Sequence, residues 1–360
     1  MSHSDGAVAG SLRFAVGERV RCRTGPMTWD AGTIAQLRYR EEEWPAGRQV
    51  PYQIELDDGR LIFAPLDSDQ LIRSDADFER LYEADREEDD TASEGIRQDL
   101  LSRYPRKHAA LFEPTELPRF LDPALSQALY SESGEARARA LESLGTVASR
   151  GLFSIRFFTD EFCAMLLEEV EHFEAWCDAE GLPVHRPNTM NNHGAILDDF
   201  GMKSMMRAVM LEVVQPLANL LGYKDVGGDT LDSHHAFVVA YALGKDLDLS
   251  FHVDSSDVTL NVCLGRSFEG GDLFFRGVRC RCHQQTGAPP HETTTFAHTP
   301  GVALLHRGHH RHGAHKITSG ERINLILWCR SSELDRSSEG ANRHPHTCQD
   351  WCWLHGAASA

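Results

Sequence analysis

The chain carries Phe251-His252-Val253-Asp254 shortly before Val258-Thr-Leu-Asn-Val-Cys-Leu264, a run of strand-forming residues. On an extended strand, residues i and i+2 share one face, so His252 and Asp254 point the same way. An imidazole and a carboxylate in this arrangement, completed by a second imidazole, form the 2-His-1-carboxylate set that holds non-haem Fe(II) and leaves coordination positions open. The pair alone is a weak signal, because His-x-Asp occurs by chance in many proteins.

The second imidazole is predicted from the histidine-rich stretch downstream, which contains His306, His309, His310, His312 and His315. His312 fits best because Arg322 follows ten residues later with Gly320 between them, and Gly320 predicts a turn that places the two on adjacent antiparallel strands facing one cavity. An arginine suits such a cavity, since its planar guanidinium binds a carboxylate through two hydrogen bonds and stays charged when buried. The other histidines are interpreted as surface or supporting groups.

Outward from this pair, the sequence predicts helices first and many short strands afterwards. An amphipathic helix is expected from Thr159 to Gly181, and another over 202–221 with a kink at Pro216. Strands are expected at 236–241, 249–252, 258–264, 272–275, 302–305 and 323–328. This order predicts an α+β protein with a double-stranded β-helix (jelly-roll) core and packed helices, and it disfavours βαβ architectures.

The N-terminal region has a different character. Short strands between Phe14 and Arg73, with a hairpin signal at Asp57-Asp-Gly59, predict a small β-barrel of SH3 or Tudor type. An acidic run at 83–90 reads as a linker. The predicted domains are a small barrel (1–78), an acidic linker and helical connector (79–150), the main domain (151–332) and a polar C-terminal tail (333–360).

Composition limits the class of protein. The 360 residues carry a net charge of −18, which argues against general affinity for nucleic acid or anionic membranes. No apolar run is long enough for a membrane span, and the first residues lack the pattern of a secretory signal. Nine cysteines, an odd number at scattered spacing, predict reduced thiols and a cytoplasmic or nuclear location.

Several longer stretches resemble one family. The chain between residues 232 and 330 resembles the prolyl-4-hydroxylase-like branch of the 2-oxoglutarate- and Fe(II)-dependent oxygenases, and within it the 2-oxoglutarate- and iron-dependent oxygenase domain-containing protein 2 family. The stretches that carry this likeness are Asp232-Ser-His-His-Ala-Phe-Val-Val, Phe251 to Gly265, Phe268-Glu-Gly-Gly-Asp-Leu-Phe-Phe-Arg-Gly277, Leu305 to Ala314, Thr318-Ser-Gly-Glu-Arg322-Ile-Asn-Leu and, upstream, Arg186-Pro-Asn-Thr-Met-Asn-Asn-His-Gly194.

The resemblance implies a dioxygenase with the catalytic iron ligands His252, Asp254 and His312, and with Arg322 on the 5-carboxylate of 2-oxoglutarate. Its cofactors would be Fe(II), 2-oxoglutarate and O2, with L-ascorbate (vitamin C) as a candidate addition. Such an enzyme hydroxylates its substrate and releases succinate and CO2, and a protein or peptide side chain is the expected substrate. The alternatives are a catalytically silent interaction protein that retains the fold, and a metal-dependent hydrolase, for which Arg322 has no purpose.

Further residues are expected around 2-oxoglutarate. Tyr241 matches a tyrosine that contacts this cosubstrate in prolyl hydroxylases. Asn261 lies on one predicted strand face with Thr259 and Cys263, and Asn324 shares a face with Arg322. Cys263 stands where some prolyl hydroxylases have a tyrosine, which leaves the second carboxylate partner open. Core packing competes as an explanation of Tyr241, Asn261 and Asn324.

Two other groups of residues have open interpretations. Cys280, Cys282 and His283, with Cys348 and Cys352, offer the ligands of a structural zinc site, although the spacing is not that of a zinc finger and reduced loop thiols are the competing explanation. The aromatic residues of the N-terminal region offer a cage for a methylated peptide through cation–π attraction, with ordinary barrel core as the alternative. These residues are Trp29, Tyr39, Trp44, Tyr52 and Phe63.

Overall fold

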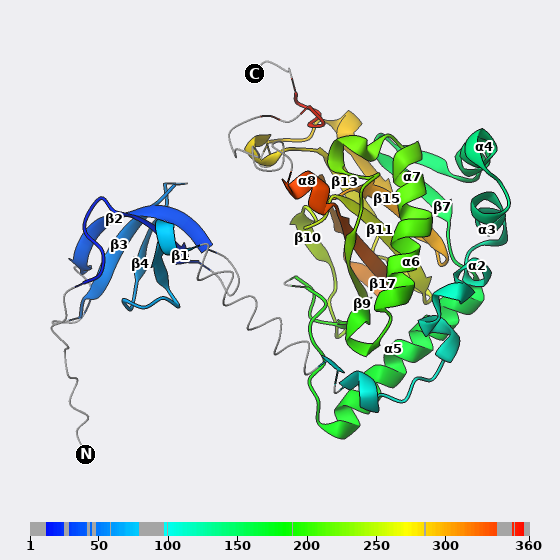
Figure 1. Ribbon diagram of the computed structural model, residues 1–360, viewed down its shortest axis with the longest axis horizontal. Coiled ribbons are helices and arrows are strands. Elements are labelled where there is room, and N and C mark those ends of the chain that lie inside the picture. Colours follow the sequence, from blue (N-terminus) through cyan, green and yellow to red (C-terminus); the bar gives the residue numbers. More distant parts are fainter. Residues whose placement is uncertain are drawn as a thin grey trace. The chain divides into compact units, whose positions relative to one another are not determined.

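A computed structural model of the chain divides it into two compact units, Met1–Ile96 and Arg97–Ala360 (Figure 1). Within them the structure describes residues 12–24, 29–41, 44, 48–57, 59–78, 97–98, 100–188, 190–283, 286–336, 348 and 350–355. Across these residues, helices long and apolar enough to cross a membrane are absent. The acidic run predicted as a linker lies outside the described residues.

The first unit contains an antiparallel sheet with the strand order β4-β3-β2-β1-β5. Alternate residues along each strand point to one side, so the apolar set of β1 and β3, including Val20, Tyr52 and Ile54, forms a core of its own. The strands are β1 (Arg19–Arg23), β2 (Trp29–Tyr39), β3 (Val50–Leu56), β4 (Leu61–Ala64) and β5 (Ile72–Ser74).

The second unit combines helices with two antiparallel sheets. Its helices are α2 (Leu117–Phe120), α3 (Pro123–Tyr130), α4 (Gly134–Leu144), α5 (Asp160–Glu180), α6 (Lys203–Ala208), α7 (Gln215–Leu220) and α8 (Ser332–Arg336). Its strands are β6 (Thr146–Ser149), β7 (Leu152–Arg156), β8 (Gly194–Ile196), β9 (Ser233–Ala242), β10 (Leu249–His252), β11 (Val258–Gly265), β12 (Phe268–Gly270), β13 (Leu273–Val278), β14 (Thr293–Phe296), β15 (Val302–Arg307), β16 (His310–Ala314) and β17 (Ile317–Arg330).

Successive strands of the second unit alternate between the two sheets. The larger sheet has the order β6-β7-β15-β11-β17-β9-β8, and the smaller one has the order β10-β16-β13-β14. Along the chain β9 lies in the larger sheet, β10 in the smaller, β11 in the larger, β13 and β14 in the smaller, β15 in the larger, β16 in the smaller and β17 in the larger. The predicted α+β class with antiparallel sheets is therefore confirmed.

The two faces of the larger sheet have different neighbours because side chains alternate along a strand. On β17, Leu325 and Leu327 belong to the main hydrophobic core, whereas Arg322 and Asn324 line a cavity on the other face. The central strands β9 and β11 divide in the same way. Helices pack on one face of the larger sheet, and the other face carries the polar side chains that line the cavity.

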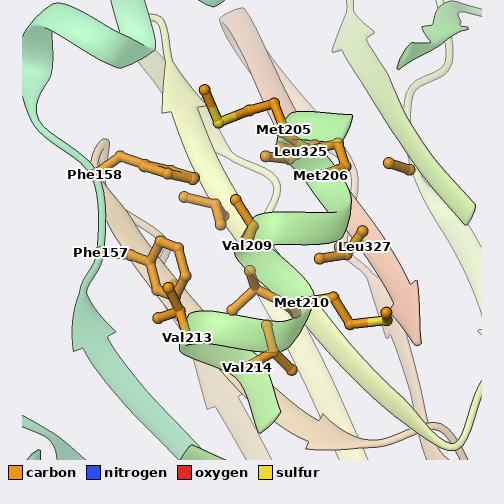
Figure 2. Packing of buried hydrophobic residues seen from close by; sticks show 14 of the residues in the cluster. Phe157, Phe158, Met205, Met206, Val209, Met210, Val213, Val214, Leu325 and Leu327 are labelled. Atoms are coloured by element: carbon orange, nitrogen blue, oxygen red, sulfur yellow. The ribbon is translucent and has the colours of Figure 1, made fainter. Parts of the chain in front are cut away.

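Helices cover the apolar face. Figure 1 shows α6 and α7 lying across the larger sheet, and Figure 2 shows Met210 near Leu327 and Val213 near Phe157 in the shared core. The residues between α6 and α7, Val209–Val214, form a π-helical segment that ends just before Pro216. The helix predicted over 202–221 is present, and its irregularity is this π-helical segment beside the proline, which has no N–H to donate.

The amphipathic helix predicted after Thr159 is confirmed as α5. The Thr159 hydroxyl accepts a hydrogen bond from Phe162 N at 3.2 Å, and Gly181 ends the helix in a left-handed conformation with φ of 68°. Leu117, Leu125 and other residues of the predicted helical connector lie in the same core as α5. The predicted domain boundaries stay predictions, but these helices belong to the packing of the second unit.

Candidate functional site

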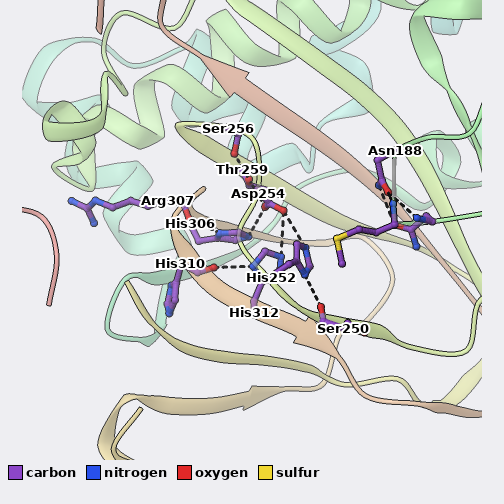
Figure 3. Close-up of polar contacts among 12 residues, drawn as sticks. Asn188, Ser250, His252, Asp254, Ser256, Thr259, His306, Arg307, His310 and His312 are labelled. Atoms are coloured by element: carbon purple, nitrogen blue, oxygen red, sulfur yellow. Dashed lines mark hydrogen bonds and ion pairs between the residues drawn. The ribbon is translucent and has the colours of Figure 1, made fainter. Parts of the chain in front are cut away.

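His252, Asp254 and His312 meet at one end of the smaller sheet. His252 on β10 pairs directly with His312 on β16, and their ring centroids are 4.3 Å apart. Asp254 follows β10, where its backbone N–H donates to the Gly308 carbonyl at 2.9 Å. The His252 and His312 Nε2 atoms lie 3.3 and 3.6 Å from Asp254 Oδ1, and one ligand atom from each residue falls within 4.8 Å of the others (Figure 3).

Both imidazoles are oriented by the backbone. His252 Nδ1 lies 2.8 Å from the Ser250 carbonyl oxygen, and His312 Nδ1 lies 2.8 Å from that of His310. A carbonyl only accepts, so each Nδ1 carries a proton, and each Nε2 is directed toward Asp254. This tautomer is the one that an Nε2 metal ligand requires.

The Asp254 carboxylate is fixed by hydroxyl groups. Its Oδ2 accepts a hydrogen bond from Thr259 Oγ1 at 2.7 Å, and Thr259 Oγ1 lies 2.7 Å from Ser256 Oγ (Figure 3). His306, fully buried, places Nε2 4.0 Å from the same Oδ2, and this nitrogen has no hydrogen-bond partner among the described residues. Oδ1 is therefore the carboxylate oxygen that faces the two Nε2 atoms.

Burial and mutual interaction set the charge of these groups. Burial lowers the pKa of His312 to about 3, so its imidazole is neutral at neutral pH. Burial alone would raise the pKa of Asp254, but the neighbouring His312 and His252 hold that pKa below its ordinary value. A neutral imidazole and an ionised carboxylate are the forms that bind a metal ion, so the residues present fit Fe(II).

A cavity of about 160 Å³ joins this cluster to the polar face of the larger sheet. All seven residues predicted for the site line it: His252, Asp254, His312, Arg322, Tyr241, Asn261 and Asn324. Apolar side chains from both sheets complete the walls, among them Leu249, Leu273 and Ile326. Such a cavity, largely apolar with a few convergent polar groups, is typical of small-molecule sites.

Arg322 is the cation of this cavity. Its guanidinium carbon lies 4.5 Å from the centroid of the Tyr241 ring, which pairs with it across β9 and β17, and Nη1 donates to the Gly271 carbonyl. The residue is 1% exposed, its Nε has no hydrogen-bond partner, and none of the described carboxylates lies within ion-pair distance. Burial lowers the pKa of Arg322, yet the ordinary value is high enough to keep it charged.

Two polar residues that the sequence did not single out support the cavity: Asn191 lines it, and His298 lies behind Asn324. Asn191 Nδ2 donates to the Tyr241 hydroxyl at 3.1 Å, and Asn324 Nδ2 donates to Asn261 Oδ1 at 2.6 Å and lies 3.2 Å from His298 Nδ1. Asn191 falls in the stretch 186–194 that resembles the family, which was its only signal. His298 comes from the loop after β14 and had none.

The predicted turn at Gly320 is wrong. Gly320 lies inside β17, opposite Phe268 of β12, with φ of 72°, and an added Cβ would lie 2.1 Å from the Ser267 carbonyl oxygen. Its glycine character permits this close strand approach rather than a reversal of the chain. His312 and Arg322 consequently belong to different sheets, β16 and β17, and approach the cavity from its two opposite walls.

Comparison with known proteins places this site in context. The model of the OGFOD2-like domain matches residues 100–228. The 2-oxoglutarate and iron-dependent oxygenase domain-containing protein ICU11 of Arabidopsis thaliana is 41% identical over 285 residues, which cover 79% of this chain and 68% of that protein. The 2-oxoglutarate and iron-dependent oxygenase domain-containing protein 2 of Danio rerio is 46% identical over 216 residues, covering 59% of this chain and 60% of that protein.

More distant matches also exist. Procollagen-lysine,2-oxoglutarate 5-dioxygenase 1 of Gallus gallus is 24% identical over 262 residues, covering 66% of this chain and 34% of that protein. A crystal structure of a Pseudomonas putida prolyl-4-hydroxylase matches 54% of this chain and 98% of that one, with a TM-score of 0.37 and 14% identity. The chain spans about two thirds or less of the length of the curated relatives it matches. On the identity and coverage of the Arabidopsis relative, the chain belongs to the family of 2-oxoglutarate and iron-dependent oxygenase domain-containing proteins.

Proposed function

We propose that this protein is an Fe(II)- and 2-oxoglutarate-dependent dioxygenase that hydroxylates a protein or peptide side chain. His252, Asp254 and His312 would hold Fe(II), and Arg322 would bind the 5-carboxylate of 2-oxoglutarate. When bound there, Fe(II) lets O2 oxidise 2-oxoglutarate to succinate and CO2 while a substrate C–H becomes C–OH.

The observation that carries the proposal is the buried Arg322. A charge taken out of water without a counter-ion costs several kcal/mol. Among the described residues no carboxylate lies within ion-pair distance of Arg322, and Asp272 acts on it only from further away, so the buried guanidinium is best explained by an anionic ligand. The cluster of three metal-binding side chains lines the same cavity. A dicarboxylate that contacts both groups at once is the ligand that this pairing favours.

The chain's other residues have supporting roles in the proposed reaction. Tyr241 and Asn191 would keep the Arg322 guanidinium in place, the former through its ring and the latter through the Tyr241 hydroxyl. Asn261 and Asn324, which are hydrogen-bonded to each other, would lie beside 2-oxoglutarate and hydrogen-bond to its oxygen atoms. Thr259 would hold one Asp254 oxygen, so that the other faces the metal. L-ascorbate is proposed as a reductant that sustains turnover.

The alternation of β9 to β17 between two sheets supports naming this core a double-stranded β-helix, or jelly roll. The protein or peptide substrate is supported by the similarity to the Gallus gallus procollagen-lysine,2-oxoglutarate 5-dioxygenase 1. A cytoplasmic or nuclear location stays a prediction from the cysteine content.

The decisive experiment supplies the purified protein with Fe(II), O2 and 2-oxoglutarate and measures succinate by nuclear magnetic resonance. We expect succinate to form and Asp254→Ala to abolish it, while Asp248→Ala, a nearby acid outside the cavity lining, leaves it unchanged. Succinate formation that survives Asp254→Ala would refute the iron assignment. A folded protein that binds neither Fe(II) nor 2-oxoglutarate would favour the silent interaction protein.

For the first unit we propose an SH3- or Tudor-like barrel that binds methylated peptides. Three of its aromatic rings gather: Trp44 lies 5.9 Å from Tyr39 and 5.2 Å from Phe63 between ring centroids, and Phe63 is 40% exposed. The antiparallel order of β1 to β5 supports the fold. Two of the five aromatic residues expected in the cage are placed elsewhere: Tyr52 is fully buried in the core, and Trp29 packs on Phe78. The proposed cage therefore consists of Tyr39, Trp44 and Phe63.

Binding of trimethyl-lysine peptides to the full chain tests this role. Trp44→Ala should abolish binding because it removes the ring shared by both contacts, and Trp29→Phe should retain it. Absence of binding to a broad peptide array would leave the aromatic group as ordinary barrel packing.

A further inference from the structure

A second group of metal-binding side chains lies away from the cavity. Cys280, Cys282 and His283 follow β13, and Cys348 and Cys352 come from a segment about 70 residues later in the chain. The structure brings these two segments together: Figure 1 shows the red C-terminal segment beside the gold loop that follows β13. None of the five residues lines the cavity.

The donor atoms are close enough to share one ion. His283 Nδ1 lies 3.4 Å from Cys280 Sγ, 3.5 Å from Cys282 Sγ and 3.6 Å from Cys352 Sγ. Cys280 Sγ lies 3.1 Å from Cys282 Sγ and 3.9 Å from Cys348 Sγ. In a tetrahedral zinc site, Zn–S bonds of about 2.3 Å and Zn–N bonds of about 2.0 Å put neighbouring donors roughly 3.5–3.8 Å apart. The observed separations lie around this value.

Four of these side chains form a complete set. One ligand atom from each of Cys280, Cys282, His283 and Cys348 lies within 4.8 Å of every other, and the fifth residue, Cys352, lies against His283. Three thiolates and one imidazole are a common structural zinc set, and soft sulfur ligands favour zinc over the oxygen-preferring iron of the cavity. With four protein ligands, such a site leaves no open position for chemistry.

Positive charge nearby suits a thiolate-rich site. Three thiolates with Zn²⁺ and a neutral imidazole carry a net charge of −1, which the interior must balance. Arg311 is 2% exposed, and its guanidinium donates to the Thr286 carbonyl of the same loop at 2.5 Å. Arg279, beside Cys280, is 1% exposed and ion-paired with Glu292.

The C-terminal segment has a clear structural use for such an anchor. Trp353 N donates to the Val278 carbonyl at 3.1 Å, the Trp353 ring lies 5.4 Å from that of His310, and the Trp351 ring lies 4.7 Å from that of His309. The segment thus packs where β16 begins, two residues before His312. Residues 350–355 themselves form turns and belong to no strand.

We propose that Cys280, Cys282, His283 and Cys348 bind a structural Zn²⁺ that fastens the C-terminal segment to the loop after β13. Zinc binding would close a loop between residues 283 and 348. The undocked C-terminal segment would then have less conformational entropy, so it would lose less entropy when it docks. The site is independent of the oxygenase chemistry proposed above, since the two clusters share no residue.

The test measures metal content of the full chain purified without chelator. The Asp254→Ala variant, which removes the iron site, should contain about one zinc per chain. In that background, Cys280→Ser with Cys348→Ser should lower the zinc content at least five-fold, whereas Cys22→Ala, in the other unit, should not change it. Replacement by Co²⁺ should give the thiolate-to-cobalt charge-transfer absorption of a tetrahedral sulfur site, which a misfolded variant cannot mimic.

Two further variants assign the fourth ligand. His283→Ala should lose zinc and Cys352→Ser should keep it; the reverse result would overturn the assignment of His283. Folded wild-type protein without zinc, or a disulfide among Cys280, Cys348 and Cys352 found by mass spectrometry of unreduced peptides, would overturn the zinc site itself. Neither result bears on succinate formation, so failure here is distinguishable from failure of the proposed function.

Discussion

His252 and His312 stand opposite each other on antiparallel strands, and each ring is held by the backbone carbonyl two residues before it in the sequence. The same local device therefore orients both imidazoles. Strand pairing and these two hydrogen bonds orient both rings, so that the two Nε2 atoms are directed at Asp254. Such preorganisation is what a functional site on rigid strands provides.

The hydroxyl behind Asp254 is predicted to tune metal affinity. Thr259→Val keeps the shape of the side chain but removes the hydrogen bond to Asp254 Oδ2, so we expect Fe(II) affinity to fall roughly 10- to 100-fold. Calorimetric or spectroscopic titration under anaerobic conditions measures this. Ser256→Ala is the matched control, because Ser256 contacts Thr259 and not the carboxylate, and its effect should be several-fold smaller. Unchanged affinity in Thr259→Val would contradict the role of the hydroxyl.

Arg322→Gln separates ligand binding from stability. The wild-type protein carries a buried guanidinium with no described carboxylate within ion-pair distance, so its removal should not lower the melting temperature of the ligand-free protein. In the wild type, 2-oxoglutarate at 100 times Kd should stabilise the folded state by about 2.7 kcal/mol and raise the melting temperature, and this rise should disappear in the variant. Differential scanning fluorimetry measures both effects. Arg276→Gln, an exposed residue of β13, should behave like the wild type; a stabilising response to 2-oxoglutarate in Arg322→Gln would argue against the carboxylate role.

The burial of His298 predicts that the free energy of unfolding falls in acid. Burial first, and then the charge of Arg322, lower the pKa of His298 to about 3, whereas the unfolded chain has the ordinary value of 6.5. Its Nδ1 faces Asn324 Nδ2, and its Nε2 lies 3.0 Å from the Val302 carbonyl oxygen. Between pH 6.5 and 3 the unfolded state binds the extra proton, so the stability contribution present above pH 6.5 declines as the pH falls.

Between pH 7 and pH 5 this single group should lower the free energy of unfolding by about 2 kcal/mol. Urea unfolding of the wild type and of His298→Gln at both pH values measures the difference. The variant should lose less stability than the wild type over this interval. Equal losses in the two proteins would show that His298 does not titrate as its burial requires.

Gly320 is predicted to be necessary for the position of Arg322, two residues further along β17. Gly320→Ala places a methyl group against the Ser267 carbonyl in addition to forcing an alanine into a left-handed conformation, so we expect a loss of roughly 2 kcal/mol or more. Gly244→Ala carries the same conformational cost, with φ of 91°, but no atom within 4 Å, and should cost about 1 kcal/mol. Thermal unfolding of both variants tests whether the close strand contact at Gly320 makes Gly320→Ala more destabilising than Gly244→Ala.

The strands that carry the site could be predicted from sequence because each follows a simple alternation or an apolar run. This applies to β11, β17 and the pair His252 and Asp254 on and after β10. β16 could not, since its residues His310–Ala314 include histidines, an arginine and a glycine and have no strand-forming pattern. Its position is decided by pairing with β10 and β13, a tertiary effect that local sequence does not encode.

Residues that act through distant partners were the hardest to foresee. Asn191 reaches Tyr241 from a loop 50 residues earlier, and His298 reaches Asn324 from the loop after β14. The cysteine group failed the usual spacing test because its ligands come from two separate segments, which no local motif can describe. Gly320 was misinterpreted for a related reason: a glycine signals unusual backbone, but only the neighbouring strand shows whether this is a reversal or a close approach.

The packing of Trp351 and Trp353 against His309 and His310 has a practical consequence for work with this protein. The polar C-terminal sequence suggests a version of the protein shortened before residue 348. Such a version lacks Trp351 and Trp353, which pack at the start of β16, the strand that carries His312. Such a truncation would be expected to crystallise poorly and to bind metal weakly for reasons unrelated to its catalytic residues. Expression trials should therefore keep the chain intact through His355.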